Sequence, residues 1–309
     1  MRILIAGGAG DVGRHLTEDF SRRGDEIRVL DRAPRRGEIE GPIQYVQGDL
    51  SDRECVQDAL KGCEAVIHLA WSFSDDPQVV MGEDIRGHLN LLEAASAGGI
   101  KSFVYASTAT VYGRAAQHPV TENHPCLIVE ARKPIYALGK YVSEELCRVY
   151  HRERKLPITI FRFWWAFGES IGGRNLRDLI GKTLKNQPVE LVRGAGGAFL
   201  SMGDLAKAVK MAMANPAASG QTYNLGTFFL TWEEIATRLI ALAGSKSNLQ
   251  FIPSEQWRGP AFLNEVWDLS WEKAGENLQY EPTEVSTALE SQFMNALRDC
   301  LNLVKQGKA

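Results

Sequence analysis

The chain lacks the features of a membrane, secreted or nucleic-acid-binding protein. Its longest apolar run, near residues 158–167, is interrupted by Arg162 and is too short to span a bilayer. Residues 3–6 are too few for the apolar core of a signal peptide and are better explained as a first strand. The formal net charge is only −3 and no basic block is present. We therefore expect a cytoplasmic protein with neither nucleic acid nor a membrane as a partner.

Cysteine is also scarce, and its distribution excludes several kinds of site. The sequence has 5 cysteines, an odd number, with no Cys-x-x-Cys pair and no histidine cluster at the spacing of metal ligands. We expect free structural thiols, no metal and no catalytic cysteine. These residues are Cys55, Cys63, Cys126, Cys147 and Cys300.

The amino terminus has the pattern of a dinucleotide-binding loop. A short apolar strand at residues 1–6 is followed at once by a glycine-rich turn and then by a helical pattern. Gly7, Gly10 and Gly13 are spaced G-x-x-G-x-x-G, which permits a tight turn and a close approach of the backbone to a pyrophosphate. Asp11 is an unusual neighbour for a phosphate. We expect its carboxylate to point outward at the start of the helix.

The second expected strand, residues 26–31, ends in an acid. Asp31 lies about 20 residues beyond the glycines, where a carboxylate can bind both hydroxyls of an adenosine ribose. It would repel a 2′-phosphate, so the sequence favours NAD over NADP. Arg32, Arg35 and Arg36 weaken this preference, because guanidinium groups bind phosphate well. The alternative is that Asp31 is only a turn residue.

Tyr136 and Lys140 form the most informative pair in the chain. Side chains at i and i+4 share one face of a helix, so the ammonium can lie beside the phenol. A nearby cation favours the phenolate and lowers the phenol pKa from its usual value of about 10. The same pair occurs on many solvated helices. Its significance therefore depends on the glycine loop and on Asp31.

Apolar and helical segments alternate along the first half of the chain. This alternation predicts an α/β fold, a Rossmann-type doubly wound parallel sheet with helices on both faces. Ligands of such sheets bind at the carboxyl ends of the strands. The expected strands are 1–6, 26–31, 43–47, 64–69, 101–107 and 157–162, and the expected helices are 11–23, 52–60, 80–97 and 134–153.

The alternation changes after Gly168, and 309 residues exceed what one compact core usually holds. We expect an NAD-binding Rossmann domain at 1–167, to which residues 203–225 return. Residues 168–202 and 226–309 are expected to form a smaller carboxyl-terminal lobe that binds the substrate.

The motifs occur in the order found in a known family. The chain resembles the extended short-chain dehydrogenases/reductases of the NAD-dependent epimerase/dehydratase type along nearly its whole length. The matching segments are Gly7 to Gly13, Gly48-Asp49-Leu50, His68-Leu69-Ala70, Ser107 to Gly113, Tyr136 with Lys140, Arg162 to Gly168, and Trp267 to Lys273.

The resemblance implies a catalytic role for three residues. Tyr136 would act as the acid/base, Lys140 would keep the phenolate charged and hold the nicotinamide ribose, and Thr108 would orient the reacting oxygen. Ser107 is the alternative to Thr108. The residues expected to bind the cofactor are Gly7, Gly10, Asp11, Val12, Gly13, Asp31, Arg32, Asp49, Leu50, Leu69, Ala70, Ser107, Tyr136 and Lys140.

The substrate half departs from the family pattern. Sugar-nucleotide epimerases usually have an asparagine where this chain has Trp165 and an arginine where it has Gly197; Asp84 replaces another asparagine. The first two changes remove strong handles for a diphosphate. Trp164 and Trp165 instead offer apolar faces on which sugar rings or aromatic groups stack, or they pack between the lobes. Arg193, with Arg174 and Arg177, could supply replacement phosphate contacts.

Three functions are consistent with these residues. The first is an NAD-dependent dehydrogenase/reductase for a small or sugar-like hydroxy compound. The second is an NAD-retaining epimerase or dehydratase for a sugar, with a nucleotide sugar as substrate, and the third is a non-catalytic NAD-binding scaffold. The resemblance also implies a homodimer built from the helices at 80–97 and 134–153. Its candidate apolar contacts are Leu89, Leu92, Val142, Leu146 and Val149.

Overall fold

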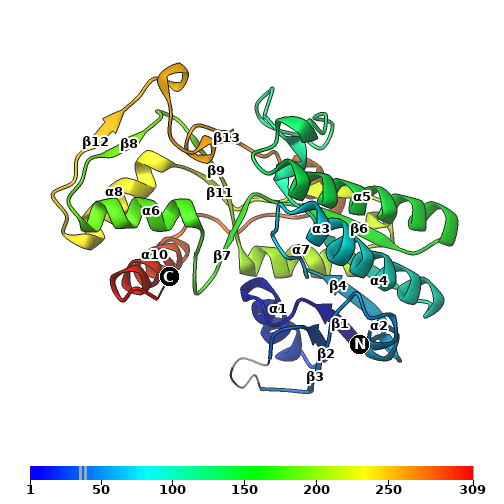
Figure 1. Ribbon diagram of the computed structural model, residues 1–309. Helices are drawn as coiled ribbons and strands as arrows, with labels where there is room; N and C mark the ends of the chain where they lie inside the picture. Colours follow the sequence, from blue (N-terminus) through cyan, green and yellow to red (C-terminus); the bar gives the residue numbers. More distant parts are fainter. Residues whose placement is uncertain (35–36, 38–39, 309) are drawn as a thin grey trace.

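A seven-stranded parallel sheet forms the centre of the larger part of the molecule (Figure 1). The computed structural model describes residues 1–34, 37 and 40–308, so Arg35 and Arg36 lie outside the described residues. The strand order β10-β6-β5-β4-β1-β2-β3 is that of a doubly wound dinucleotide-binding sheet, which confirms the predicted fold class. The strands are β1 (Arg2–Ala6), β2 (Glu26–Asp31), β3 (Ile43–Gln47), β4 (Ala65–His68), β5 (Ser102–Ala106), β6 (Ile158–Arg162) and β10 (Thr222–Asn224).

Helices cover both faces of this sheet because successive strand side chains point to opposite sides. In β1, Ile3 and Ile5 pack toward one layer of helices, whereas Leu4 and Ala6 pack toward the other. The first layer contains α1 (Asp11–Ser21), α7 (Met202–Ala214) and α9 (Glu272–Leu278). The second contains α2 (Arg53–Leu60), α4 (Arg86–Ala97) and α5 (Pro134–Arg154).

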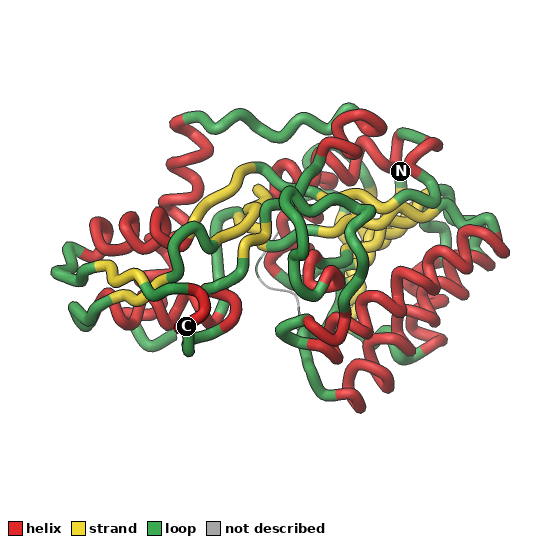
Figure 2. Tube along the Cα trace, turned by 90° about the horizontal axis from the view of Figure 1, so that it is seen from above, coloured by secondary structure: helices red, strands yellow, loops and turns green. Residues whose placement is uncertain are grey.

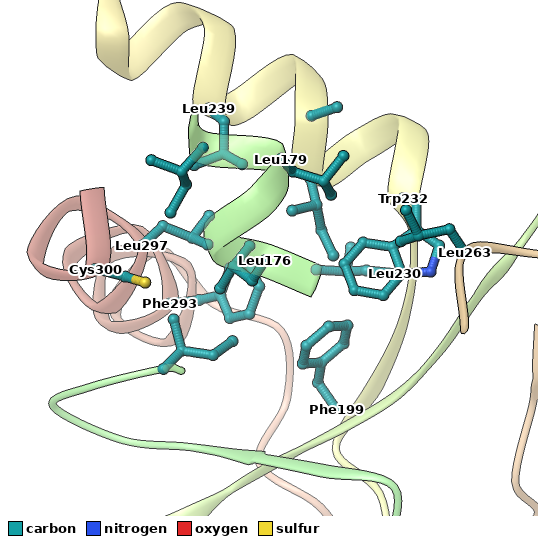
Figure 3. Close-up of a cluster of buried hydrophobic side chains, with 14 of the residues drawn as sticks. Leu176, Leu179, Phe199, Leu230, Trp232, Leu239, Leu263, Phe293, Leu297 and Cys300 are labelled. Atoms are coloured by element: carbon teal, nitrogen blue, oxygen red, sulfur yellow. The ribbon is translucent and has the colours of Figure 1, made fainter. Parts of the chain in front are cut away.

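The smaller lobe has its own sheets and its own hydrophobic core. Its helices α6 (Arg174–Leu184), α8 (Trp232–Ala243) and α10 (Thr287–Lys305) pack on short strands. Figure 3 shows Leu176, Leu179, Leu239, Phe293 and Leu297 from these three helices pointing toward one another. The strands are β7 (Trp165–Phe167), β8 (Val189–Leu191), β9 (Gly196–Ser201), β11 (Phe228–Thr231), β12 (Leu249–Phe251) and β13 (Val266–Trp267).

The chain passes between the two parts several times. Strand β9 belongs to the lobe, yet it runs straight into α7 on the main sheet, where Ser201 caps the helix by accepting the Asp204 N–H. Strand β10 then pairs with β6 at the edge of the main sheet before β11 returns to the lobe. Seen from above, the lobe and the main sheet lie side by side (Figure 2). We propose the division stated above, 1–167 with 203–225, and 168–202 with 226–309, except that α9 within the last range packs on the main sheet.

The remaining helical segments are short. Two of them, α3 (Pro77–Val79) and the π-type segment η1 (Val80–Ile85), continue into α4, and together they carry the chain away from the end of β4. The others are single 3₁₀ turns: η2 (Ala109–Tyr112), η3 (Ile128–Glu130), η4 (Pro216–Ala218), η5 (Ser254–Gln256) and η6 (Ala261–Leu263). All five cysteines are free thiols, as the sequence predicts. Within the described residues, no helix is both long enough and apolar enough to cross a membrane.

Candidate cofactor and catalytic site

The turn between β1 and α1 brings backbone groups very close together. A Cβ on Gly7 would lie 2.5 Å from the Ala70 nitrogen, and one on Gly13 would lie 2.1 Å from the Gly7 oxygen. Gly7 also has φ +86°, a conformation that other residues rarely adopt. Gly10 caps α1 without a side chain, so the first N–H groups of the helix are left available for an anion. The residues present thus fit a bound pyrophosphate.

A pocket opens beside this turn, at the carboxyl ends of β1, β2 and β4. It brings together eight of the residues expected to bind a cofactor, and it adds neighbours that were not among the expected cofactor-binding residues. The expected residues that line it are Gly7, Gly10, Asp31, Arg32, Asp49, Leu50, Leu69 and Ala70. The additional ones include Trp71, Phe73, Glu83 and Asp84.

Other expected residues lie outside this lining. Asp11 is exposed and lines a different surface pocket with Glu169 and Met202, while Val12 packs against the core beneath α1. Gly13 supports the turn from behind. Thus the helix start contributes backbone, and the Asp11 carboxylate points elsewhere, as we expected.

Charged groups at the adenosine end of the pocket are already organised. The Asp31 carboxylate accepts the N–H of Ala9 at 2.9 Å and that of Ala33 at 2.9 Å, which fixes its position. The Arg32 guanidinium donates to Glu83 at 2.8 Å and lies 3.5 Å from Asp49. Arg32 is therefore held by two carboxylates rather than left open for a 2′-phosphate.

Asp49 remains a carboxylate despite partial burial. Burial alone would raise its pKa, but the Ser51 N–H at 2.8 Å and the Arg32 guanidinium hold the pKa below the usual value. An ionised acid at this edge of the pocket can accept hydrogen bonds from an amine.

Tyr136 lies near the start of α5 and is almost completely buried. Burial raises the pKa of its phenol to about 12, whereas a hydrogen bond with the Thr108 side chain and the charge of Arg132 act in the opposite direction. Lys140 does not act on this phenol, so the depression of the Tyr136 pKa expected from the helix spacing is wrong for this state. The reason is that the ammonium points elsewhere.

The Lys140 ammonium is directed toward the sheet. It donates to the Ala106 carbonyl oxygen at 2.9 Å and lies 4.2 Å from the centroid of the Trp71 ring and 5.0 Å from that of Tyr105. Burial lowers its pKa to about 7, opposed by the charge of Asp84. Both the charged and the neutral form of Lys140 are therefore populated near neutral pH.

Neutral groups lie behind Lys140. The rings of His68 and His88 stack with centroids 5.1 Å apart, and both are completely enclosed. Burial lowers the pKa of His88 to about 3 and that of His68 well below its usual value, with Lys140 adding to both effects. Both imidazoles therefore stay uncharged next to the ammonium.

The loop after β4 packs over Tyr136. The Phe73 ring stacks on the Tyr136 ring with centroids 5.9 Å apart, and the Asp75 carboxylate accepts the Tyr136 backbone N–H at 2.8 Å. Phe73 is 66% exposed and has φ +56°, which is unusual for a side chain of its size. Since Trp71 and Phe73 also line the cofactor pocket, this loop connects the pocket to Tyr136.

The Ser107 hydroxyl is engaged in a buried network. It donates to Glu144 at 2.5 Å, and Glu144 also accepts from the Arg162 Nε at 2.8 Å. Arg162 and Ser107 hold the pKa of this carboxyl below its usual value although burial acts to raise it. The Thr108 hydroxyl lies outside this network: it donates to the Thr110 hydroxyl at 3.0 Å, and it acts to lower the Tyr136 pKa.

Trp164 and Trp165 belong to an aromatic cluster in the lobe. Trp164 stacks on Phe262 with centroids 5.0 Å apart, and Trp165 stacks on Phe199 at 5.7 Å. A Cβ on Gly197 would lie only 2.4 Å from the Trp164 ring, so the missing side chain there makes room for the indole. Both tryptophans are half-buried.

Arg193 is placed apart from this group. Its guanidinium lies 3.9 Å from the centroid of the Phe251 ring and 3.6 Å from a Glu233 oxygen. No contact joins it to Tyr136 or Thr108 within the described part of the chain. The sequence missed Arg132 instead, whose only signal was its position four residues before Tyr136.

No group of three or more histidine, cysteine, aspartate or glutamate side chains among the described residues could hold a metal ion.

Comparisons with known proteins match this geometry. The model of the NAD-dependent epimerase/dehydratase family matches residues 3–226. A putative UDP-glucose 4-epimerase of Methanocaldococcus jannaschii is 30% identical over 227 residues, which are 68% of this chain and 73% of that protein. UDP-glucuronic acid decarboxylase 1 of Danio rerio is 29% identical over 82% of this chain, which spans only 64% of that relative.

Solved structures share the whole architecture. The structure of UDP-glucose 4-epimerase with UDP-glucose from Thermotoga maritima has a TM-score of 0.78 at 22% identity and covers 100% of both chains. A Bordetella bronchiseptica enzyme in complex with NAD has a TM-score of 0.78 at 20% identity, covering 98% of this chain and 94% of that one. At these identities the likeness shows the fold alone.

Proposed function

Because this chain belongs to the NAD-dependent epimerase/dehydratase family, we propose that it is an NAD-dependent oxidoreductase of the extended short-chain type. It acts at a hydroxyl or keto carbon of a small or sugar-like substrate. The observation that carries the proposal is the position of Tyr136 against Phe73, because the loop that carries Phe73 also lines the cofactor pocket.

Each residue of this group has a defined task. Tyr136 removes the hydroxyl proton during oxidation and returns it during reduction, and Thr108 hydrogen-bonds the reacting oxygen. NAD, when bound, supplies the acceptor or donor of the hydride. Lys140 holds the nicotinamide ribose, and its ammonium must leave the Ala106 carbonyl to bring positive charge to the phenol. Such charge is needed because the Tyr136 pKa of about 12 favours the neutral phenol at physiological pH.

The cofactor-binding residues support NAD over NADP. We propose that the α1 start, Gly10 to Gly13, holds the pyrophosphate and that Asp31 binds the adenosine ribose hydroxyls. Asp31 would repel a 2′-phosphate, and the ion pairs of Arg32 with Glu83 and Asp49 leave that cation poorly placed to bind one. We propose that the other expected residues that line this pocket also bind the cofactor; they are Gly7, Asp49, Leu50, Leu69 and Ala70.

A second function, an NAD-retaining epimerase or dehydratase for nucleotide sugars, is favoured by the names of the relatives. It differs from the first in the fate of the cofactor. A dehydrogenase releases reduced cofactor and gains absorbance at 340 nm with its substrate, whereas an epimerase retains NAD through purification with no net change. A non-catalytic scaffold is the third alternative, and it predicts NAD binding without turnover of any hydroxy compound.

The replacement Tyr136→Phe tests the catalytic proposal. It removes only the phenolic oxygen, and proton transfer of this kind contributes about 10²–10⁴-fold to the rate. We expect turnover to be lost while NAD binds with its wild-type dissociation constant. Turnover near the wild-type rate would exclude Tyr136 as the acid/base. Tyr141→Phe, at a half-buried tyrosine of the same helix, serves as the matched control.

We also propose a homodimer formed through α4 and α5 in the cytoplasm. Leu89 and Val149 are 38% and 44% exposed on these helices, whereas Leu92 is buried against the sheet and is unavailable for such a contact. Five free thiols are typical of a reducing compartment. Light scattering of wild type and of Leu89→Asp tests the dimer. If the introduced aspartate left the molar mass of the particle unchanged, this interface would be contradicted.

We retain Trp164 and Trp165 as proposed faces for the substrate. The exposed part of their half-buried rings supports this role. Arg193 remains a weaker candidate because its guanidinium is engaged by Phe251 and Glu233.

A further inference from the structure

We propose that Arg132 binds an anionic group of the substrate, a carboxylate or a phosphate, next to the carbon that reacts at Tyr136. This inference rests on the proposed function, because it places the substrate against Tyr136 and Thr108. It narrows the substrate class from hydroxy compounds in general to sugar acids, sugar phosphates and related hydroxy anions.

Arg132 lies four residues before Tyr136 in the chain. It is two residues ahead of α5, and its charge acts on the Tyr136 phenol in the direction that favours the phenolate. The charge of Arg132 is thus felt at the phenol, and its guanidinium lies over Phe262, which packs on Trp164. An anion held by Arg132 would lie next to the atoms that exchange the proton.

The Arg132 charge is left without an acidic partner. Within the described residues, no carboxylate lies within 4.0 Å of its guanidinium, and no side chain or backbone oxygen accepts a hydrogen bond from it. Glu265 is the acid whose charge acts on it most, but the Glu265 carboxylate accepts the Trp267 indole N–H at 2.8 Å. By contrast, Arg162 and Arg32 are both paired with carboxylates.

Arg132 combines access with desolvation. The residue is exposed, so a dissolved ligand can reach it, yet the surrounding protein lowers the pKa of its guanidinium through desolvation. A cation in such a place binds an anion more strongly than one in open water, because its charge is less screened. The unpaired and desolvated charge also raises the free energy of the empty site, and a bound anion would lower that free energy again.

An aromatic platform orients the guanidinium. Its Cζ lies 4.2 Å from the centroid of the Phe262 ring, and Phe262 packs on Trp164 and Trp165 with centroids 5.0 Å and 5.2 Å apart. A guanidinium positioned by a ring keeps its planar fork of N–H groups available for two oxygens of one anion. The neighbouring indoles offer apolar faces for the carbon skeleton of the same molecule.

The Arg132 guanidinium can bind either a carboxylate or a phosphate, and four probes distinguish these two kinds of anion. D-glucose carries no anion, D-glucuronate carries a carboxylate, D-glucose 6-phosphate carries a phosphate, and UDP-glucose carries a diphosphate with a nucleotide. Each is titrated calorimetrically into the NAD-loaded full-length protein, and NADH formation is followed in parallel.

We expect at least one anionic probe to bind wild type at least tenfold more tightly than D-glucose. Arg132→Met, which keeps an unbranched side chain, should abolish that difference, and Arg132→Lys should restore only part of it because the fork is lost. Arg298→Met, at an exposed arginine of α10 that donates to Asn295, should leave the difference intact.

Failure of this inference can be told apart from failure of the proposed function. Equal affinity for all four probes in wild type, or anion binding by Arg132→Met as tight as in wild type, would overturn the role of Arg132. In Tyr136→Phe we expect anion binding to persist without turnover. If that variant turned over at the wild-type rate, the proposed chemistry would be wrong whatever the titrations of Arg132→Met showed.

Discussion

Replacing Lys140 with methionine is expected to stabilise the protein while removing its activity. Lys140 is 4% exposed, and burial lowers its pKa from 10.5 to about 7. Between these two values the unfolded chain binds more protons than the folded one, so wild-type stability rises with pH across this window. The destabilisation is complete below pH 7 and disappears as pH rises through 10.5.

The size of the effect follows from the pKa difference. One pKa unit corresponds to about 1.4 kcal/mol, so the buried ammonium costs about 4 kcal/mol at pH 7 and only about 1 kcal/mol at pH 9.5. Methionine is of similar length and carries no charge, but it leaves the Ala106 carbonyl without its donor, which costs about 1 kcal/mol. The variant should therefore exceed wild type by about 3 kcal/mol at pH 7 and match it at pH 9.5.

Urea unfolding at both pH values measures this difference directly. Lys61→Met, at an exposed lysine that pairs with Asp58, is the matched control and should change stability little at either pH. The electrostatic reasoning is refuted if Lys140→Met is less stable than wild type at pH 7, or if the gap stays constant with pH. A variant that is more stable but inactive would show that the site retains a costly charge for function.

Three further predictions concern residues that hold the fold and the cofactor. Glu144→Gln should lower the free energy of unfolding by about 3–5 kcal/mol, because Arg162 would keep a buried charge without its partner. A decrease below about 1 kcal/mol, measured by urea unfolding, would disprove this. Gly197→Ala should cost about 1–3 kcal/mol and shift the tryptophan emission, since the new methyl group displaces Trp164, and an unchanged spectrum would count against that packing. Asp31→Asn should weaken the affinity for NAD by at least about tenfold, as expected for the loss of one charge-assisted contact, and it should reduce the preference for NAD over NADP. Fluorescence titrations measure both affinities, and an equal loss of affinity for the two cofactors would contradict the contact of Asp31 with the ribose.

Much of the fold was predictable from the sequence alone. Strand and helix periods place the six amino-terminal strands and four helices of the main sheet within a few residues of their observed bounds. The return of β10 to this sheet was also expected. The lobe was less predictable, because strands of two or three residues such as β13 carry too little periodicity to be detected.

The candidate site was predictable as a set of residues but not as a set of contacts. Helix spacing places Tyr136 and Lys140 on one face, yet it cannot show that the ammonium turns to Ala106. The direction of the pKa shift of the Tyr136 phenol depends on where the Lys140 ammonium points and on burial, and both are properties of the tertiary structure. Phe73 and Arg132 were missed because they lie in irregular segments that precede or follow the recognisable motifs.

The route of the chain limits how the two parts of this protein can be separated or moved. The polypeptide crosses from one part to the other near residues 167, 202 and 225, and again on either side of α9. At the second crossing Ser201 ends a strand and caps a helix without any linker. No single cut therefore yields either part as one continuous piece. Because several covalent connections join the two parts, a large rotation of one against the other would strain all of them together.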